Sequence, residues 1–173
     1  MAKHIILGDG IFAIGGVDLG LTRGGGSFSI EREYREVNAD GDMGPVKDRI
    51  TKVRSVAKLS MNMLEIDDTN LDALFPATTQ STDGATDVTT WEGTYDVEPE
   101  HFQSTVTWTG RTKGGLSVVI TLENAINLEN IEWAMVTKEE IVPAVTYTAV
   151  YTEENREGKD GEGWTVEFIP AEE

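Results

Sequence analysis

The acidic residues around Asp40 have the types and spacing of a calcium-binding loop. Asn38, Asp40 and Asp42 occupy alternate positions, as the first oxygen ligands of an EF-hand loop do. Met43 replaces the glycine that such a loop requires, and Arg49 replaces its closing glutamate. Aspartate and glycine also favour turns. The run therefore predicts a turn, and we expect no metal site.

The histidines and a glycine run are the next candidates for chemistry. His4 and His101 are far apart, and neither has a neighbouring serine or acid in a known catalytic pattern. We expect both at strand ends on the surface. Gly24-Gly25-Gly26 has no following lysine and precedes a strand, so it predicts a turn with positive φ rather than a phosphate loop. The chain has no cysteine, which excludes a thiol nucleophile. We expect no enzyme, no catalytic residue and no cofactor.

Four tryptophans could form the aromatic platform of a carbohydrate-binding site. They are Trp91, Trp108, Trp133 and Trp164. Each lies in a predicted strand, where packing into the core is the usual role of a large aromatic side chain. A β-sandwich module that binds carbohydrate or decorates a virion remains an alternative, and it would require coplanar, exposed tryptophans.

Apolar stretches separated by turn residues predict a mainly β chain. Ser27–Asn38 and Arg54–Ile66 alternate apolar and polar residues, which is typical of half-buried strands. Gly8-Asp9-Gly10 predicts a hairpin turn. Strand-dense chains of this size form sandwiches or barrels, and we expect a single domain over residues 1–173. The other predicted strands are His4–Leu7, Ile11–Ile14, Val88–Thr94, Phe102–Thr109, Leu116–Leu122, Ile126–Val136, Val142–Tyr151 and Trp164–Ile169.

One helix and two loops interrupt the predicted strands. A short apolar stripe predicts a helix over Asp67–Phe75, which Pro76 ends. Polar residues predict surface loops at 77–90 and 153–162. The segment 127–140 fits a strand followed by a turn, and it also fits a helix.

The net charge of −17 is distributed unevenly. Residues 1–66 hold nine acids and nine bases, whereas residues 67–173 hold twenty-two acids and five bases. Binding to a phosphate backbone needs clustered lysine and arginine, so this balance argues against it. No apolar stretch has the length of a signal peptide core or a membrane span. We expect no membrane contact and a protein that stays in the cytoplasm until a larger particle carries it out.

A glycine-rich turn after Leu21 leads into the first long strand, and an acidic-then-basic loop joins it to the second. This arrangement resembles the tail-tube proteins, or major tail proteins, of long-tailed bacteriophages. The resemblance is clear over residues 1–66 and looser beyond them. The segments that carry it are Gly20–Gly26, Glu31–Arg35, Ala39–Lys47, Val56–Leu59 and Leu64–Ile66, with weaker echoes at Ile120–Ala125 and Val142–Ala149.

The resemblance implies a fold and a function. It implies a β-sandwich with one flanking helix, six copies in a ring, and inner sheets that join into a β-barrel. Stacked rings form the tube through which DNA passes without specific binding. Partners would be further copies and the tape measure, distal tail and terminator proteins. The location would be the virion tail, after assembly in the host cytoplasm. The inner tube of a contractile tail, a tailocin or a secretion system is an alternative.

The connection between the two long strands is longer than their pairing requires. A tight hairpin needs about two to five residues, whereas Ala39–Val53 spans about fifteen, and such loops are often functional. We expect an arm that contacts a neighbouring subunit through apolar anchors and basic side chains. Its residues would be Asp40, Asp42, Met43, Pro45, Val46, Lys47, Arg49, Ile50 and Lys52.

The polar face of the two long strands is the candidate wall of the tube. Alternation places it opposite the apolar sets Phe28, Ile30, Tyr34 and Leu59, Met61, Met63. An acidic or neutral wall repels phosphates and would let DNA pass. The alternative is that this face meets outside solvent. Its residues are Ser29, Glu31, Glu33, Lys58, Ser60 and Asn62.

Overall fold

The computed structural model describes residues 4–66 and 71–170 of the chain. Nearly all regular structure in these residues is antiparallel β, so the prediction of a mainly β fold is confirmed. The strands are β1 (Ile6–Ile14), β2 (Val17–Asp18), β3 (Thr22–Glu36), β4 (Ile50–Met63), β5 (Thr78–Asp83), β6 (Val88–Gly93), β7 (Gln103–Thr112), β8 (Ser117–Asn127), β9 (Ala144–Ala149) and β10 (Trp164–Ile169). The helical pieces are η1 (Lys47–Arg49), α1 (Leu71–Leu74) and η2 (Pro99–His101).

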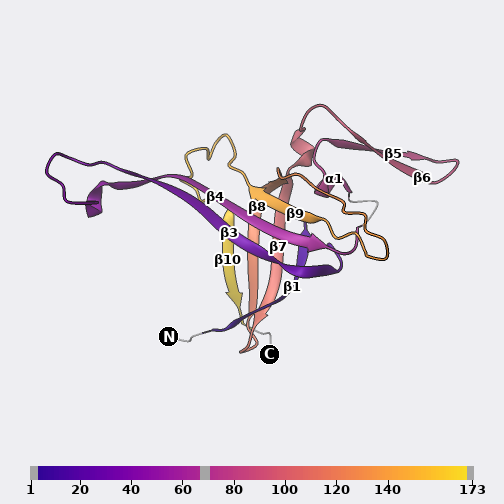
Figure 1. The fold of residues 1–173 in the computed structure, drawn as a ribbon, viewed down its shortest axis with the longest axis horizontal. Coiled ribbons are helices and arrows are strands. Elements are labelled where there is room, and N and C mark those ends of the chain that lie inside the picture. The colour runs from indigo at the N-terminus through magenta and orange to yellow at the C-terminus, as the bar shows by residue number, and fades with distance from the viewer. Residues whose placement is uncertain (1–3, 67–70, 171–173) are drawn as a thin grey trace.

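The main sheet has the order β2-β1-β7-β8-β9-β4-β3 and turns over on itself. Strand β8 makes this possible because its two halves have different partners on one edge. Its residues 117–122 pair with β10, and its residues 125–127 pair with β9. The chain thereby forms two layers, with β3, β4 and β9 crossing in front of β1, β7, β8 and β10 (Figure 1).

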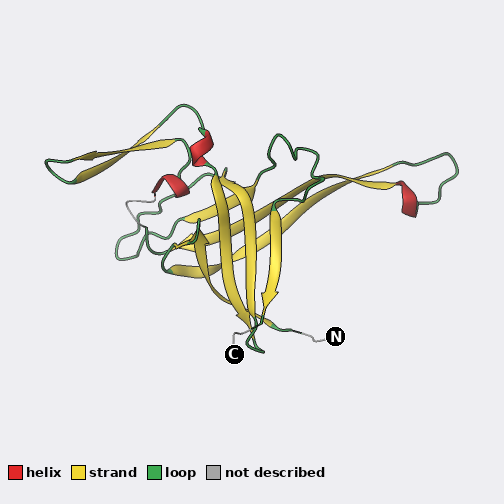
Figure 2. Cartoon of the chain, turned by 180° about the vertical axis from the view of Figure 1, so that it is seen from behind, coloured by secondary structure: helices red, strands yellow, loops and turns green. Residues whose placement is uncertain are grey.

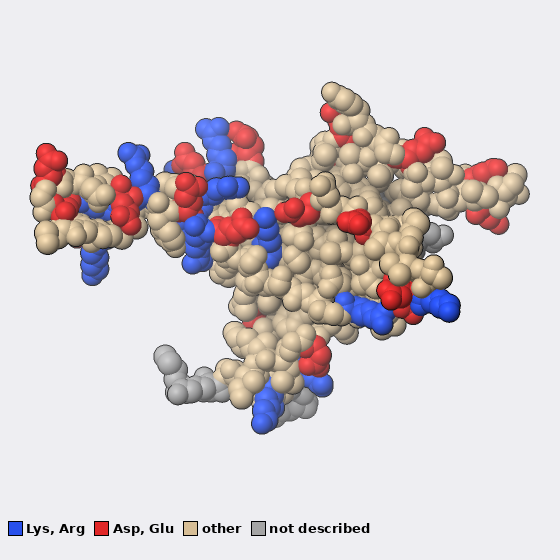
Figure 3. All heavy atoms as spheres, in the orientation of Figure 1, with Lys and Arg blue, Asp and Glu red and all other residues tan. Residues whose placement is uncertain are grey.

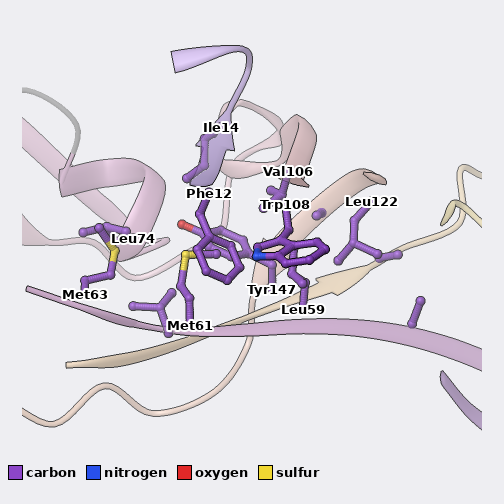
Figure 4. Packing of buried hydrophobic residues seen from close by; sticks show 14 of the residues in the cluster. Phe12, Ile14, Leu59, Met61, Met63, Leu74, Val106, Trp108, Leu122 and Tyr147 are labelled. Carbon is purple, nitrogen blue, oxygen red and sulfur yellow. The ribbon is translucent and has the colours of Figure 1, made fainter. Parts of the chain in front are cut away.

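The space between the two layers holds the hydrophobic core (Figure 4). Tyr147 is fully buried there, and its hydroxyl donates to the backbone oxygen of Ala73 over 2.8 Å. The side chain of Asn127 donates to the backbone oxygen of Leu74 over 2.9 Å. These two bonds fix α1 against the end of the sheet. The helix predicted over Asp67–Phe75 is present at Leu71–Leu74, and residues 67–70 lie outside the described residues.

Glycines allow the layers to approach closely. A side chain at Gly10 or Gly110 would collide with the ring of Trp108. At Gly26, where β3 passes over the core, a Cβ would collide with the backbone oxygen of Ser60 and with the ring of Phe12. A Cβ at Gly10 would also meet a backbone oxygen, that of Thr109. Because a backbone atom cannot rotate away as a side chain can, Gly26, whose backbone contact is the closer of the two, is the most constrained of these positions.

We therefore expect the Gly26→Ala substitution to lower the free energy of unfolding by about 1–3 kcal/mol, the usual cost of overpacking. Urea denaturation followed by tryptophan fluorescence would measure it. The matched control is Gly8→Ala, since a Cβ at Gly8 has no atom within 4 Å and its backbone is not left-handed. Equal stability of the two variants would contradict the close approach of β3 to Ser60 and Phe12 at Gly26.

The prediction of a hairpin at Gly8-Asp9-Gly10 is wrong. Strand β1 runs through this segment and pairs with β7, and its register shifts between Ile6 and Gly10. Glycine at this point serves the close approach of Trp108 rather than a chain reversal. The reversal comes later, at Gly15 and Gly16, which both have positive φ and join β1 to β2.

The prediction of a surface loop over residues 77–90 is also wrong. Strands β5 and β6 form a separate two-stranded hairpin there, which projects from the body (Figure 2). At its tip Asp83 accepts hydrogen bonds from the backbone of Ala85 and from the hydroxyl of Thr86. These bonds lower the pKa of the Asp83 carboxyl. The threonines that suggest a loop by polarity are β-branched and suit an exposed strand.

The strand and the helix considered for 127–140 are both wrong, since residues 128–143 form no strand or helix. The turn predicted after the strand is present, and in it the backbone nitrogen of Glu139 donates to the oxygen of Val136 over 3.2 Å. The strand predicted at Ile126–Val136 ends at Asn127, and the strand predicted from Val142 starts at Ala144. The segment is held instead by side chains. Trp133 packs on Phe75 with ring centroids 5.9 Å apart.

Candidate assembly surfaces

The outer edge of β3 is the longest unpaired edge of the sheet. Strand β3 pairs with β4 alone, and no other strand in the described part of the chain meets its second edge. A hollow of about 240 Å³ opens beside this edge, between the two layers. Its lining is mostly apolar and includes Phe28 of β3, Ile6 of β1, Trp108 of β7 and Ile120 of β8. An open edge next to exposed apolar surface is a ready template for another chain.

The predicted polar face of β3 and β4 exists as predicted. Ser29 lies opposite Lys58 across the two strands, and Ser27 lies opposite Ser60. The alternate residues of β4 on the other face are buried, with Leu59 only 2% exposed. The alternation also sets Glu31, Glu33 and Asn62 on the polar face.

Lys58 lies at the centre of this polar face. Its ammonium is 3.2 Å from the carboxylate of Glu31 and 3.3 Å from that of Glu129. Hydrogen bonds to Glu31 and then to Glu129 raise the pKa of Lys58. The sequence analysis missed Glu129, because it comes from the irregular segment that follows β8. The sequence analysis also missed Thr146 of β9, whose hydroxyl lies 2.9 Å from that of Ser60.

Beyond the body, β3 and β4 continue as a projecting ribbon, here named the distal hairpin (residues 32–54), seen at the left of Figure 1. The predicted arm Ala39–Val53 forms its outer part, but its bounds are corrected: β3 reaches Glu36 and β4 begins at Ile50. Ile50 and Lys52 are therefore strand residues. Tyr34, predicted on the apolar face, is 54% exposed because it lies in the ribbon beyond the core.

The tip of the distal hairpin contains the turn that the Asp-Gly-Asp run predicts. The carboxylate of Asp42 accepts from the backbone of Ala39 and from Arg49, both over 2.7 Å. Asp42 is thus engaged within the turn. The described residues contain no group of three or more His, Cys, Asp or Glu side chains arranged to hold a metal ion. Met43, at the tip, is fully exposed.

The loop after β9 covers part of the second edge of β4. Strand β9 pairs with β4 only from Lys58 to Asn62. Beyond that point the hydroxyl of Tyr151 donates to the backbone oxygen of Ser55 over 2.9 Å. The carboxylate of Glu162 accepts from the Ser55 hydroxyl over 2.7 Å and forms an ion pair with Lys52. The sequence predicts this loop but not its role, which is to block an edge of the sheet.

Removing the Glu162 carboxylate is expected to destabilise the protein. Glu162→Ala would leave the Ser55 hydroxyl and the indole nitrogen of Trp164 without the acceptor that each uses now. Unsatisfied groups of this kind cost about 1–3 kcal/mol, which urea denaturation would detect. Glu154→Ala, at an exposed position of the same loop, is the control. Equal unfolding midpoints for the two variants would show that the contacts of Glu162 contribute nothing to stability.

The histidines and tryptophans have structural surroundings. The prediction that His101 lies on the surface is wrong: it is 7% exposed, and its Nδ1 accepts from the backbone of Glu98 over 2.8 Å. His4 is exposed, as predicted. Trp108 lies in the core, and Trp164 packs on Phe28. The prediction of core packing is confirmed for these two tryptophans. It is wrong for Trp133, which is 38% exposed and lies in no strand, and Trp91 lies in β6 of the projecting hairpin.

No family model matches the chain, and no curated protein matches it. No helix in residues 4–66 and 71–170 has the length and apolar character needed to span a bilayer.

Proposed function

We propose that the chain is the structural subunit of a phage tail tube, which assembles into stacked hexameric rings. Its two layers would be a β-sandwich of the tail-tube type. The observation that carries the proposal is the long free edge of β3 beside an apolar hollow. A second copy pairing at this edge would satisfy its backbone groups and cover the hollow. Repeated around a ring, this pairing would join the sheets of all copies into a barrel.

The covered edge of β4 limits how copies can pair. If both edges of this layer were open, copies could add in two ways and the ring would lack a defined register. The contacts of Glu162 and Tyr151 leave β3 as the open edge of this layer in the described residues. In a ring the free β3 edge of each copy would then meet a different surface of the next copy, because closed rings are built from heterologous contacts.

The charge of the polar face suits a conduit. Glu31 and Glu33 supply negative charge, and Lys58 is offset by two carboxylates. A wall of this kind would not hold a duplex by counterion release. The tube would guide DNA during ejection without binding it. The tape measure, distal tail and terminator proteins would be the other partners, and the virion tail the location. The inner tube of a contractile tail, a tailocin or a secretion system would use the same ring.

Negative-stain electron microscopy of the concentrated protein tests the proposal. We expect rings with six-fold symmetry, or hollow tubes built from them. The acidic surface can keep dilute subunits apart, so the protein should be imaged over a range of concentrations and at raised salt. Particles with another symmetry, or a protein that stays monomeric under all these conditions, would contradict it.

A further inference from the structure

A second candidate contact surface lies on the side of the sheet away from the distal hairpin. It consists of residues 92–102 and 128–143, here named the α1 end. Both segments are tied to the region of α1: the backbone nitrogen of Thr94 donates to the oxygen of Ala77 over 2.7 Å, and Trp133 packs on Phe75. In Figure 1 the β5–β6 hairpin takes the end of the long axis opposite the distal hairpin, and the α1 end lies between β5–β6 and the sheet.

The α1 end exposes apolar side chains to an unusual degree. Tyr95 is 99% exposed, Met135 81% and Leu128 62%. Val136 and Trp133 are also among the exposed large apolar residues. Large apolar side chains that stay exposed in these two segments are candidates for a site of protein contact.

The same segments are strongly acidic. They hold eight acids and one base, Lys138. Glu129 and Glu140 have ion partners elsewhere in the chain, in Lys58 and Arg23. Glu132 and Glu139 are exposed and have no ion pair in the described structure. The partner of this surface should therefore offer apolar side chains together with unpaired positive charge.

The distal hairpin has this chemistry. It carries six of the fourteen lysines and arginines of the chain. Arg35 and Lys47 are exposed and form no ion pair with the described residues. Met43 and Val37 expose apolar surface beside them. Figure 3 shows basic and acidic side chains interspersed along this hairpin. A two-stranded ribbon is marginally stable alone in water, so the hairpin also gains from a surface to pack on.

We propose that the α1 end of one copy receives the distal hairpin of the next copy. The inference rests on the proposed function and names a second contact, separate from the pairing at the β3 edge. Because the two surfaces lie on opposite sides of the sheet, they meet only between different copies. Such a contact is heterologous, and repetition produces a ring or an open stack. Apolar packing between Met43 of one copy and Met135 of the other supplies buried contact area, and the opposite charges set the orientation of the two copies.

Chemical cross-linking tests this contact directly, because the chain has no cysteine of its own. A Met43→Cys protein is mixed with a Met135→Cys protein that carries a size tag, so that only contacts between copies give the mixed dimer. A short bifunctional maleimide should give this dimer in high yield. The control partner is a tagged Glu167→Cys protein, with the cysteine at an exposed position of β10. Equal or greater yield with the control would overturn the proposal.

Charge reversal then tests the complementarity. Arg35→Glu with Lys47→Glu in the Met43→Cys protein should lower the yield of mixed dimer at least tenfold. Adding Glu132→Lys and Glu139→Lys to the Met135→Cys protein should restore it. Circular dichroism checks that each variant is folded, and Lys47→Glu alone serves if the double change is not. An unchanged yield, or no recovery in the reversed pair, would overturn the inference.

The outcomes separate this contact from the tube function. Mixed dimers without rings or tubes in the microscope would support the contact and contradict the tube. Tubes without mixed dimers would support the tube and overturn the contact. The absence of both would overturn both.

Discussion

Replacing Lys47, Arg49 and Lys52 with glutamate is expected to abolish polymerisation and to leave the subunit folded. The distal hairpin then changes from six bases and five acids to three bases and eight acids. It would be repelled by the acidic surface of a neighbouring copy. The fold should survive because these side chains lie outside the core, with Arg49 and Lys52 42% and 44% exposed. Their partners Asp42 and Glu162 are only 20% and 16% exposed, so a modest loss of stability is expected with the change.

Sedimentation velocity and negative-stain microscopy would measure the loss of assembly, and circular dichroism the retained fold. The control is the triple variant Arg111→Glu, Arg156→Glu and Lys159→Glu. It makes the same change in net charge, at side chains that are also in exposed ion pairs. The control should assemble. Tubes of normal appearance from the variant with the altered hairpin would end the assignment of this hairpin to a subunit contact.

Replacing Glu31 and Glu33 with lysine is expected to leave tubes intact and to slow or block the ejection of DNA. Both residues lie on the polar face, away from the core, and are exposed. Every subunit of every ring would contribute the change, so the wall would become strongly positive. Such a wall releases counterions from the duplex and retains it, more strongly at low salt. Lys58 would lose its carboxylate partner at position 31, which adds to the positive charge.

Ejection can be followed by the release of DNA from purified particles that carry the variant, at several salt concentrations. The matched control is Glu154→Lys with Glu167→Lys, at exposed positions outside the polar face. Normal ejection from the Glu31 and Glu33 variant would show that the polar face is not the wall. A further check uses cysteines at Ser29 and Asn62 in assembled tubes. Their reaction with a reagent too large to enter the bore would place this face outside.

The sequence pattern predicts the structure correctly where the outcome depends on local backbone geometry alone. The alternation of β4 predicts that Ala57, Leu59 and Met61 are buried, and all three are at most 2% exposed. Period-two alternation depends only on the geometry of an extended chain, so it survives without knowledge of the partner strand. The turn at Asp40 is similarly local, because Asp42 bonds within its own loop.

Prediction failed where a residue serves a distant neighbour. Gly10 suggests a turn in isolation, but it is needed where the ring of Trp108 crosses. The strand predicted at Ile126–Val136 ends at Asn127. At this point the backbone pairs with β9, and the side chain of Asn127 binds the backbone of Leu74 in α1. Short apolar segments such as 128–136 fit a strand or a helix equally by pattern, and here packing selects neither.

By itself the sequence determined the β character of the chain, the two faces of its long strands and the uneven distribution of its charge. The tertiary structure alone decided which edges stay open. Glu162 reaches Ser55 across 107 positions of sequence, and Glu129 reaches Lys58 across 71. The reason is physical: side-chain periodicity is a property of a few consecutive residues, whereas the pairing of strands depends on how all of them bury their apolar faces together.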